Sequence, residues 1–227
     1  MNTANIMKSC INTPRVRELL DALYADAAQN DPLVRDIARQ AGEFSRTGGS
    51  FLGEMRKAYS AVPPEFGRLL YALARATRAR TVVEFGTSFG VSTIHLAAAI
   101  RDNGGGRVIT TEFAPDKAER AKKNLTDAGL ADLVEFRVGD ALQTLAGPVG
   151  EIDMVFLDGA KNLYFDVLKL LEPGLRSGAI VASDNTDHDG VEAFLDYIRN
   201  PANGYTTSAI FTAKHEHRHG HEITVRN

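Results

Sequence analysis

The spacing of hydrophobic and polar residues changes near residue 80. Before that point apolar residues recur every three or four positions, as on the buried face of a helix. Two such sets are Val16, Leu19, Leu20 and Leu23, and Phe66, Leu69, Leu70 and Leu73. From Thr81 onward, short runs typical of strands alternate with longer helix-like segments. Strands that alternate with helices predict an α/β fold whose mainly parallel sheet is covered on both faces.

Prolines mark the expected helix boundaries in the N-terminal part. A first helix is expected to begin at Thr13-Pro14, because proline is favoured in the first turn. Asp31-Pro32 predicts the start of a second helix that runs to about Glu43. Pro63-Pro64 forces an extended step, after which a third helix is expected.

The alternating region predicts five parallel strands and a final hairpin. The expected parallel strands are Thr81–Phe85, Arg107–Glu112, Val134–Val138, Ile152–Asp158 and Ala179–Asp184. The helix-like segments are Ser92–Ile100, Pro115–Ala128, Tyr164–Leu171 and Val191–Arg199. Tyr205–Thr212 and His221–Arg226 are linked too closely for a crossover helix, so an antiparallel hairpin is expected. The predicted organisation is a helical cap over residues 1–60 followed by one domain over residues 61–227.

Composition narrows the class of protein. The chain has 227 residues, of which 44% are hydrophobic and 24% charged, which excludes a disordered chain or a coiled-coil rod. One cysteine, Cys10, allows no intramolecular disulfide and no thiolate zinc site. A net charge of −3 gives no electrostatic footprint for nucleic-acid binding. Because no apolar run fits a signal peptide or a membrane span, we expect a cytoplasmic protein that acts on something small.

A glycine-rich turn follows the first predicted strand. The stretch from Glu84 to Gly90 places glycine at 86 and 90, between a strand and a helix. The dinucleotide fingerprint would require glycine at 84, 86 and 89, where this chain has Glu84, Gly86 and Phe89. A glutamate beside the turn suits a cationic ligand better than a pyrophosphate. S-adenosylmethionine, with its sulfonium and ammonium groups, has the matching charge.

Acidic residues end the next two predicted strands. Glu112 is placed to accept hydrogen bonds from a ribose diol, and Asp140 from an adenine amino group. Each acid alone is also explained as a helix N-cap. The ordered appearance of such acids and glycines after three successive strands favours a nucleoside site.

A second polar group follows the fourth and fifth predicted strands. Asp158, Asp184 and Asn185 come at strand ends that meet at one edge of a parallel sheet. Their oxygen atoms suit Mg²⁺ or another oxygen-preferring dication, although both aspartates are alternatively capping or turn residues. Lys161 is a candidate general base near such a cation, or else a solvated surface lysine.

These motifs together resemble a known enzyme family. The matching stretches are Pro64–Leu70, Val83–Gly86 continuing to Ser92, Asp153–Asp158 continuing to Lys161, and Asp184-Asn185. They resemble the metal-dependent class I O-methyltransferases of the catechol and caffeoyl-CoA O-methyltransferase group, and they cover roughly two-thirds of the chain. The resemblance implies a Rossmann-like methyltransferase fold with a seven-stranded sheet. It also implies a homodimer, because members of the group are often dimers.

The resemblance also implies roles for individual residues. The cofactor S-adenosylmethionine would be bound by Val62, Glu84, Gly86, Gly90, Ser92, Glu112, Asp140 and Ala141. The metal, Mg²⁺ or a similar dication, would be bound by Asp158, Asp184 and Asn185, and Lys161 would be the catalytic base. The implied reaction is methyl transfer to a hydroxyl of a small, aromatic vicinal diol. The absence of tryptophan and the polar stretch Thr186–Asp189 indicate a wider, more polar acceptor pocket than in the catechol enzymes.

Three questions stay open at the level of sequence. The alternating histidines from His215 to His221 are interpreted as a solvated hairpin tip, with a substrate lid or a second metal site as alternatives. A tRNA hydroxyuridine methyltransferase is a rival function, for which Arg75, Arg78 and Arg80 would supply a basic patch. A catalytically silent protein that binds S-adenosylmethionine is the second rival.

Overall fold

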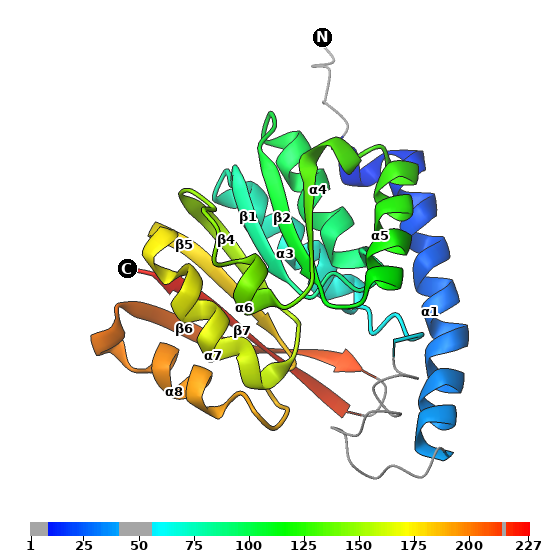
Figure 1. Cartoon of the computed structure of the whole chain (residues 1–227). Coiled ribbons are helices and arrows are strands. Elements are labelled where there is room, and N and C mark those ends of the chain that lie inside the picture. Colours follow the sequence, from blue (N-terminus) through cyan, green and yellow to red (C-terminus); the bar gives the residue numbers. More distant parts are fainter. Residues whose placement is uncertain (1–8, 41–55, 215–216) are drawn as a thin grey trace, which may run out of the picture.

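A seven-stranded sheet forms the centre of the protein in a computed structural model of the chain (Figure 1), which describes residues 9–40, 56–214 and 217–227. The strand order is β3-β2-β1-β4-β5-β7-β6. Strands β1 to β5 pair in parallel, whereas β7 is antiparallel to both β5 and β6. The bounds are β1 Thr81–Phe85, β2 Arg107–Glu112, β3 Val134–Val138, β4 Ile152–Leu157, β5 Leu175–Asp184, β6 Tyr205–Lys214 and β7 His217–Arg226. The predicted α/β fold is therefore confirmed, including its C-terminal hairpin.

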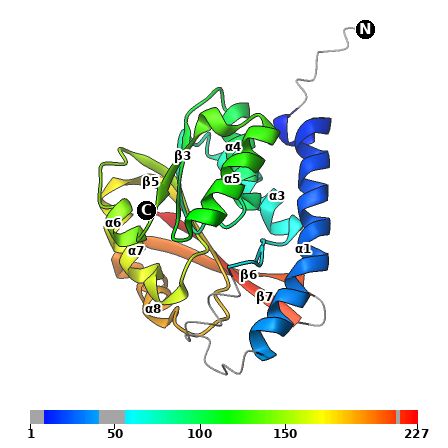
Figure 2. The ribbon, with the colours of Figure 1, turned by 45° about the vertical axis from the view of Figure 1, so that its right-hand side comes forward.

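Helices cover both faces of the sheet (Figures 1 and 2). Those on one face are α1 Pro14–Gln40, α3 Pro64–Ala76, α4 Val91–Asp102 and α5 Pro115–Ala128. Those on the other face are α6 Ala141–Thr144, α7 Tyr164–Leu171 and α8 Glu192–Arg199. In the described part of the chain, no helix is long and apolar enough to cross a membrane.

The central strand β4 shows why the parallel strands read as continuous apolar runs. All six of its residues are buried. Met154 and Phe156 point into the core under α3 and α4, and Val155 and Leu157 point into the core under α7 and α8. Because successive side chains of a strand face opposite sides, a strand covered on both faces carries consecutive apolar residues, as from Met154 to Leu157. Asp153 near the amino end of β4 is the exception.

The N-terminal helix differs from its prediction. Two helices were expected on either side of Pro32, but the structure has one continuous helix, α1, that passes through it. The Asp31 carboxylate accepts hydrogen bonds from the backbone amides of Tyr59, at 2.7 Å, and Ser60, at 2.9 Å. This contact holds the second half of α1 against the domain, which offsets the backbone hydrogen bond that Pro32 cannot donate. The expected end of the second helix, near Glu43, lies outside the described residues.

The interpretation of the histidines as a solvated tip is wrong where the structure describes them. Strand β7 begins at His217, and the side chains of His219 and His221 are only 5% and 0% exposed. Because β7 pairs with β5 in the register that sets His221 opposite Asp184, both side chains enter the protein interior. His215 lies outside the described residues.

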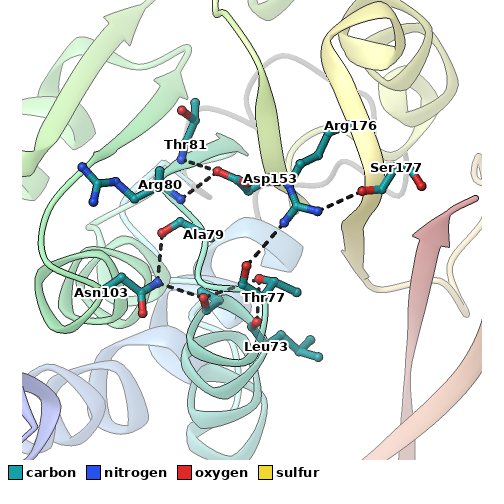
Figure 3. A network of polar contacts seen from close by, with 10 residues as sticks. Leu73, Thr77, Ala79, Arg80, Thr81, Asn103, Asp153, Arg176 and Ser177 are labelled. Atoms are coloured by element: carbon teal, nitrogen blue, oxygen red, sulfur yellow. Dashed lines mark hydrogen bonds and ion pairs between the residues drawn. The ribbon is translucent and has the colours of Figure 1, made fainter.

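A polar network fixes the amino ends of the central strands (Figure 3). Asp153 of β4 accepts hydrogen bonds from the backbone amides of Arg80, at 2.7 Å, and Thr81, at 2.9 Å, and from Nε of Arg176 at 2.6 Å. Arg176 also donates to the Thr77 carbonyl at 3.3 Å. Burial opposes ionisation of Asp153, but these donors outweigh it and hold the pKa of the carboxyl below its usual range. One carboxylate thus ties β1, β4 and β5 together.

Candidate active site

The turns after β1 and β4 touch each other at the carboxyl ends of the strands. The Asp158 amide donates to the Phe85 carbonyl at 2.8 Å. Gly86 has a positive φ of +102°, and a Cβ there would lie 2.7 Å from the Asp158 carbonyl oxygen. The chain runs outward from β1 to β3 and then returns to β4 on the other side of β1. This is the switch point of the sheet, where open α/β folds bind their ligands.

Glu84, next to the glycine turn, connects β1 to the start of α4 and to β2 through hydrogen bonds. Its buried carboxylate accepts hydrogen bonds from the hydroxyls of Ser92 at 2.7 Å, Thr93 at 2.5 Å and Thr110 at 2.6 Å. Burial raises the pKa of Glu84 to about 7, although the three hydroxyl donors act in the opposite direction. Glu84 and Ser92, both predicted cofactor residues, are therefore bonded to each other at the start of α4.

Glu112 connects the glycine turn to the start of α5. Its carboxylate accepts from the Ser88 amide at 2.8 Å and from the Ala114 amide at 2.9 Å. The Ser88 hydroxyl in turn donates to the Tyr59 carbonyl at 2.6 Å. The segment that leads to the buried Val62 is thereby fixed against the turn. Glu112, predicted to bind the ribose of the cofactor, thus bonds to the turn, and Val62, predicted to hold the cofactor's carboxylate, follows the segment that is fixed there.

Two predicted cofactor positions have additional structural duties. Gly90 has a φ of +83°, and a Cβ there would approach the Leu125 side chain of α5 to 2.9 Å. This glycine is therefore needed for close packing of the turn against α5. Asp140 is the N-cap of α6, because its carboxylate accepts from the Leu142 amide at 2.9 Å. Ala141 is the buried first residue of that helix.

A lysine, an aspartate and a tyrosine meet after β4. Lys161 Nζ lies 3.1 Å from Asp158 Oδ1 and 2.9 Å from the Tyr164 hydroxyl. The Tyr164 hydroxyl donates to the Asp184 carbonyl at 3.0 Å, which links this group to the end of β5. Burial raises the pKa of Asp158 to about 7, Lys161 lowers it and Asp184 raises it further. Tyr164 was not among the predicted site residues and was expected only as the first residue of the helix Tyr164–Leu171.

Asp184 is surrounded by nitrogen atoms at the end of β5. His219 Nε2 lies 2.9 Å and His221 Nδ1 lies 2.6 Å from Asp184 Oδ1. Asn185, with a positive φ of 55°, places its side-chain amide 3.1 Å from His219 Nε2. Burial opposes ionisation of Asp184, but the two imidazoles outweigh it and hold the pKa of Asp184 well below its usual range.

The structure thus brings the predicted residues together in two adjacent groups. Glu84, Gly86, Ser92 and Glu112 surround the glycine turn, and Asp158, Lys161, Asp184 and Asn185 lie beyond it. Asp140 and Ala141 stand farther along the sheet, after β3. His219 and His221 were expected in a solvated tip, with a second metal site only as an alternative, but the structure places both beside Asp184. Their period of two, which puts both on one face of a strand, was the signal for that alternative.

Comparisons with known proteins agree with this geometry. A family model described as "Methyltransferase domain" matches residues 83–186. The catechol O-methyltransferase of Niastella koreensis is 37% identical over 164 residues, which cover 70% of this chain and 73% of that protein. The catechol O-methyltransferase of Mycobacterium tuberculosis is 42% identical over 133 residues, which cover 57% of this chain and 59% of that protein. The crystal structure of the O-methyltransferase TomG from Streptomyces achromogenes, in complex with S-adenosylmethionine, matches with a TM-score of 0.65 and 33% identity, covering 74% and 82% of the two chains.

A Rossmann-like sheet with a glycine turn and acidic residues at its switch point defines the class I methyltransferases that use S-adenosylmethionine. Within that class the chain belongs to the O-methyltransferases of the catechol O-methyltransferase-like family, and it is an S-adenosylmethionine-dependent O-methyltransferase. The family resemblance of the sequence is confirmed, and the silent-protein alternative is set aside.

Proposed function

We propose that this enzyme methylates a hydroxyl of a small aromatic vicinal diol, such as a catechol, with the help of a divalent cation. One observation carries the proposal: Asp158 and Lys161 lie beside the glycine turn and are linked to Asp184 through the Tyr164 hydroxyl. The names of the two catechol O-methyltransferases among its relatives support the same acceptor class.

The glycine turn is proposed to bind S-adenosylmethionine, which supplies the methyl group on a sulfonium. Glu84, Gly86, Gly90 and Ser92 would hold the methionine part together with Val62. Glu112 would accept hydrogen bonds from the ribose diol, and Asp140 with Ala141 would border the adenine. Glu112 ends β2 and Asp140 follows β3, in the order in which ribose and adenine follow the sulfonium, which supports this orientation.

The metal is proposed to bind between the two strand ends through Asp158, Asp184 and Asn185. The pKa of Asp158 is raised by burial and further by electrostatic repulsion from the buried carboxylate of Asp184, and a bound cation would relieve this repulsion. A ring nitrogen of His221 without a hydrogen-bond partner lies 2.6 Å from Asp184 Oδ1, which also supports a cation there. When bound there, a dication would supply Lewis-acid chemistry and would lower the pKa of the acceptor hydroxyl.

Lys161 is proposed as the general base that accepts the hydroxyl proton at Nζ. Asp158 and the Tyr164 hydroxyl fix that nitrogen from two sides, at 3.1 Å and 2.9 Å. Tyr164 is itself held by the Asp184 carbonyl, so the base and the end of β5 keep a constant separation. Such positioning is the main contribution that the protein can make to methyl transfer.

The direct test measures release of S-adenosylhomocysteine with catechol, caffeoyl-type acids and simple phenol, before and after EDTA treatment. We expect turnover of the vicinal diols, little turnover of phenol, and loss of turnover with EDTA that added dication restores. Turnover that EDTA leaves unchanged would overturn the metal requirement. Turnover of phenol equal to that of catechol would overturn the requirement for a vicinal diol.

The tRNA alternative gains no support from the position of its arginines. Arg75, Arg78 and Arg80 precede β1, at the amino ends of the strands. Asp158 and Lys161 follow β4, at the carboxyl ends. A basic patch at the first end would bind nucleic acid far from the proposed reacting groups.

We also propose that residues 1–60 act as a helical cap and that the enzyme is a homodimer. Val16, Leu20 and Leu23 of α1 are buried in the same core as α3 to α5, which supports a cap integral to the domain. Leu33 and Ile37 of α1 are 61% and 52% exposed and offer apolar surface for a second copy. Light scattering coupled to size exclusion measures the mass in solution, and a monomer at micromolar concentration would contradict the dimer.

A further inference from the structure

We propose that the cation at this site is a d-block dication of the Zn²⁺, Fe²⁺ or Co²⁺ kind rather than Mg²⁺. In this proposal His219 and His221 bind the ion directly, together with Asp184. The inference rests on the proposed function for the role of the ion, but metal binding itself can be measured without any acceptor.

The three side chains converge from two strands. Asp184 ends β5, while His219 and His221 occupy alternate positions of the neighbouring strand β7. Their ligand atoms all lie within 4.8 Å of one another, and all three side chains are buried. Two donor atoms bound to one metal at about 2.1 Å, with bond angles of roughly 90–110°, lie about 3.0–3.4 Å apart. The separations of 2.9 Å and 2.6 Å from Asp184 Oδ1 are both shorter than this range, so small shifts of the imidazoles away from the carboxylate would admit an ion.

The hydrogen bonds of His221 favour an ion over a simple ring–carboxylate bond. Its Nε2 is 2.8 Å from the Thr212 hydroxyl, and its ring stacks on Phe66 with centroids 3.8 Å apart. Its Nδ1 is fully buried and has no hydrogen-bond partner, although Asp184 Oδ1 is only 2.6 Å away. In the tautomer whose proton is on Nε2 and is donated to the Thr212 hydroxyl, Nδ1 has a lone pair that faces the carboxylate. Such an arrangement needs a cation between the two atoms, and metal-bound histidines have their second nitrogen paired in this way.

The chemistry of the donors selects the class of metal. Imidazole nitrogen is a preferred ligand of zinc, iron, cobalt and related ions, whereas Mg²⁺ takes oxygen ligands and retains water. Two histidines and one carboxylate also leave coordination positions open, which two oxygens of a vicinal diol can fill. The site is thus suited to the same acceptor with a different metal from the Mg²⁺ that the sequence predicted.

The test uses the full-length enzyme, stripped of metal with a chelator and titrated with Co²⁺ while visible absorption is recorded. We expect ligand-field bands that saturate at one ion per chain, disappear when Zn²⁺ is added, and persist in excess Mg²⁺. His221→Gln and His219→Gln should each weaken Co²⁺ binding about 100-fold or more, at or above the cost of losing an outer-sphere partner. His95→Gln is the matched control, because His95 is also a buried histidine, at 3% exposure, but bonds to Tyr24 instead. It should bind Co²⁺ like the parent.

Three outcomes would overturn the proposal: no Co²⁺ bands, displacement of Co²⁺ by Mg²⁺, or unchanged affinity in both histidine variants. Loss of affinity in His219→Gln alone would move the ion to the neighbouring group of Asp187, His188 and His219. His219→Gln also keeps the test valid if His221→Gln fails to fold. Co²⁺ binding without turnover of any diol would defeat the proposed function and leave the metal site standing. Turnover supported by Mg²⁺ without Co²⁺ binding would do the reverse.

Discussion

Two aspartates near opposite ends of β4 have pKa values that are shifted in opposite directions. Asp153, at the amino end, accepts hydrogen bonds from two backbone amides and a guanidinium, and its pKa is depressed (Figure 3). Asp158, just past the carboxyl end, has Lys161 as its charged partner, and burial raises its pKa to about 7. The Asp153 carboxylate thus has three hydrogen-bond donors, whereas the Asp158 carboxylate has the ammonium of Lys161.

The difference shows how a parallel sheet separates stability from chemistry. At the amino ends, the hydrogen-bond donors near Asp153, which are the amides of Arg80 and Thr81 and the guanidinium of Arg176, are all bonded to its carboxylate. At the carboxyl ends, the turns after β1, β4 and β5 leave polar groups facing one another. Ionisable groups with strongly shifted pKa values cluster at functional sites for this reason.

The largest expected effect is on Asp158, and a replacement without loss of activity would contradict the contrast between a structural Asp153 and a functional Asp158. We expect Asp158→Asn to lower turnover about 1,000-fold, because it removes a charge from the proposed metal and base. The melting temperature should not fall, since the fold already favours the neutral form of this carboxyl. S-adenosylhomocysteine release and calorimetric binding of S-adenosylmethionine measure the two effects. Normal turnover would remove Asp158 from the site, whereas lost cofactor binding would point to a damaged turn.

Glu84, another buried carboxyl at the carboxyl ends of the strands, should make the free energy of unfolding depend on pH. Its pKa is raised from 4.5 to about 7, so between these values the folded protein keeps a proton that the unfolded chain has lost. Stability should therefore fall as pH rises through this window, by on the order of 3 kcal/mol at about 1.4 kcal/mol per unit. Glu84→Gln should remove this component. Urea unfolding at several pH values measures it, and an identical pH slope in the variant would contradict the assignment.

The role of Lys161 as a general base can be tested by the pH dependence of turnover. Lys161→Met should lower turnover about 100-fold at neutral pH, as expected for loss of a general base. The deficit should shrink at alkaline pH, where more of the acceptor is already ionised. Lys169→Met is the control, because Lys169 pairs with Glu172 on the surface of α7. A deficit of equal size at every pH would indicate a positioning role instead.

Asp153→Asn should give the smallest effect, and it should act on stability alone. Loss of the charge-assisted bond to Arg176 should cost about 2 kcal/mol of the free energy of unfolding. The depressed pKa of Asp153 predicts that this contribution in the parent disappears as pH falls toward the acid range. Asp132→Asn, which breaks an exposed ion pair with Arg101, should cost much less. A marked drop in turnover of Asp153→Asn would mean that the two ends of β4 are not independent.

Most of the sheet and half of the site could be predicted from local patterns. The bounds of Val134–Val138 and Pro115–Ala128 agree with the structure, because burial period and turn residues determine them locally. The meeting of Asp158 with Asp184 was also predictable, since the carboxyl ends of parallel strands share one edge.

The two failures both concern contacts between distant segments. Asp31-Pro32 was predicted to start a second helix, yet the bonds from Asp31 to the amides of Tyr59 and Ser60 accompany one continuous helix, α1. The histidines depend on the register that sets His221 opposite Asp184. The alternating histidines alone do not indicate which residue of β5 each of them faces, so the register could not be predicted from them.

The contact between Gly86 and the Asp158 carbonyl has a consequence for how this enzyme can change over time. No side chain fits at residue 86 unless the backbone after β4 moves. A substitution of Gly86 therefore displaces the loop that holds Asp158 and Lys161 as well. Evolution or laboratory redesign cannot change residue 86 without also changing that loop. New acceptor specificity is more accessible through residues outside this contact, such as the polar stretch Thr186–Asp189 that follows β5.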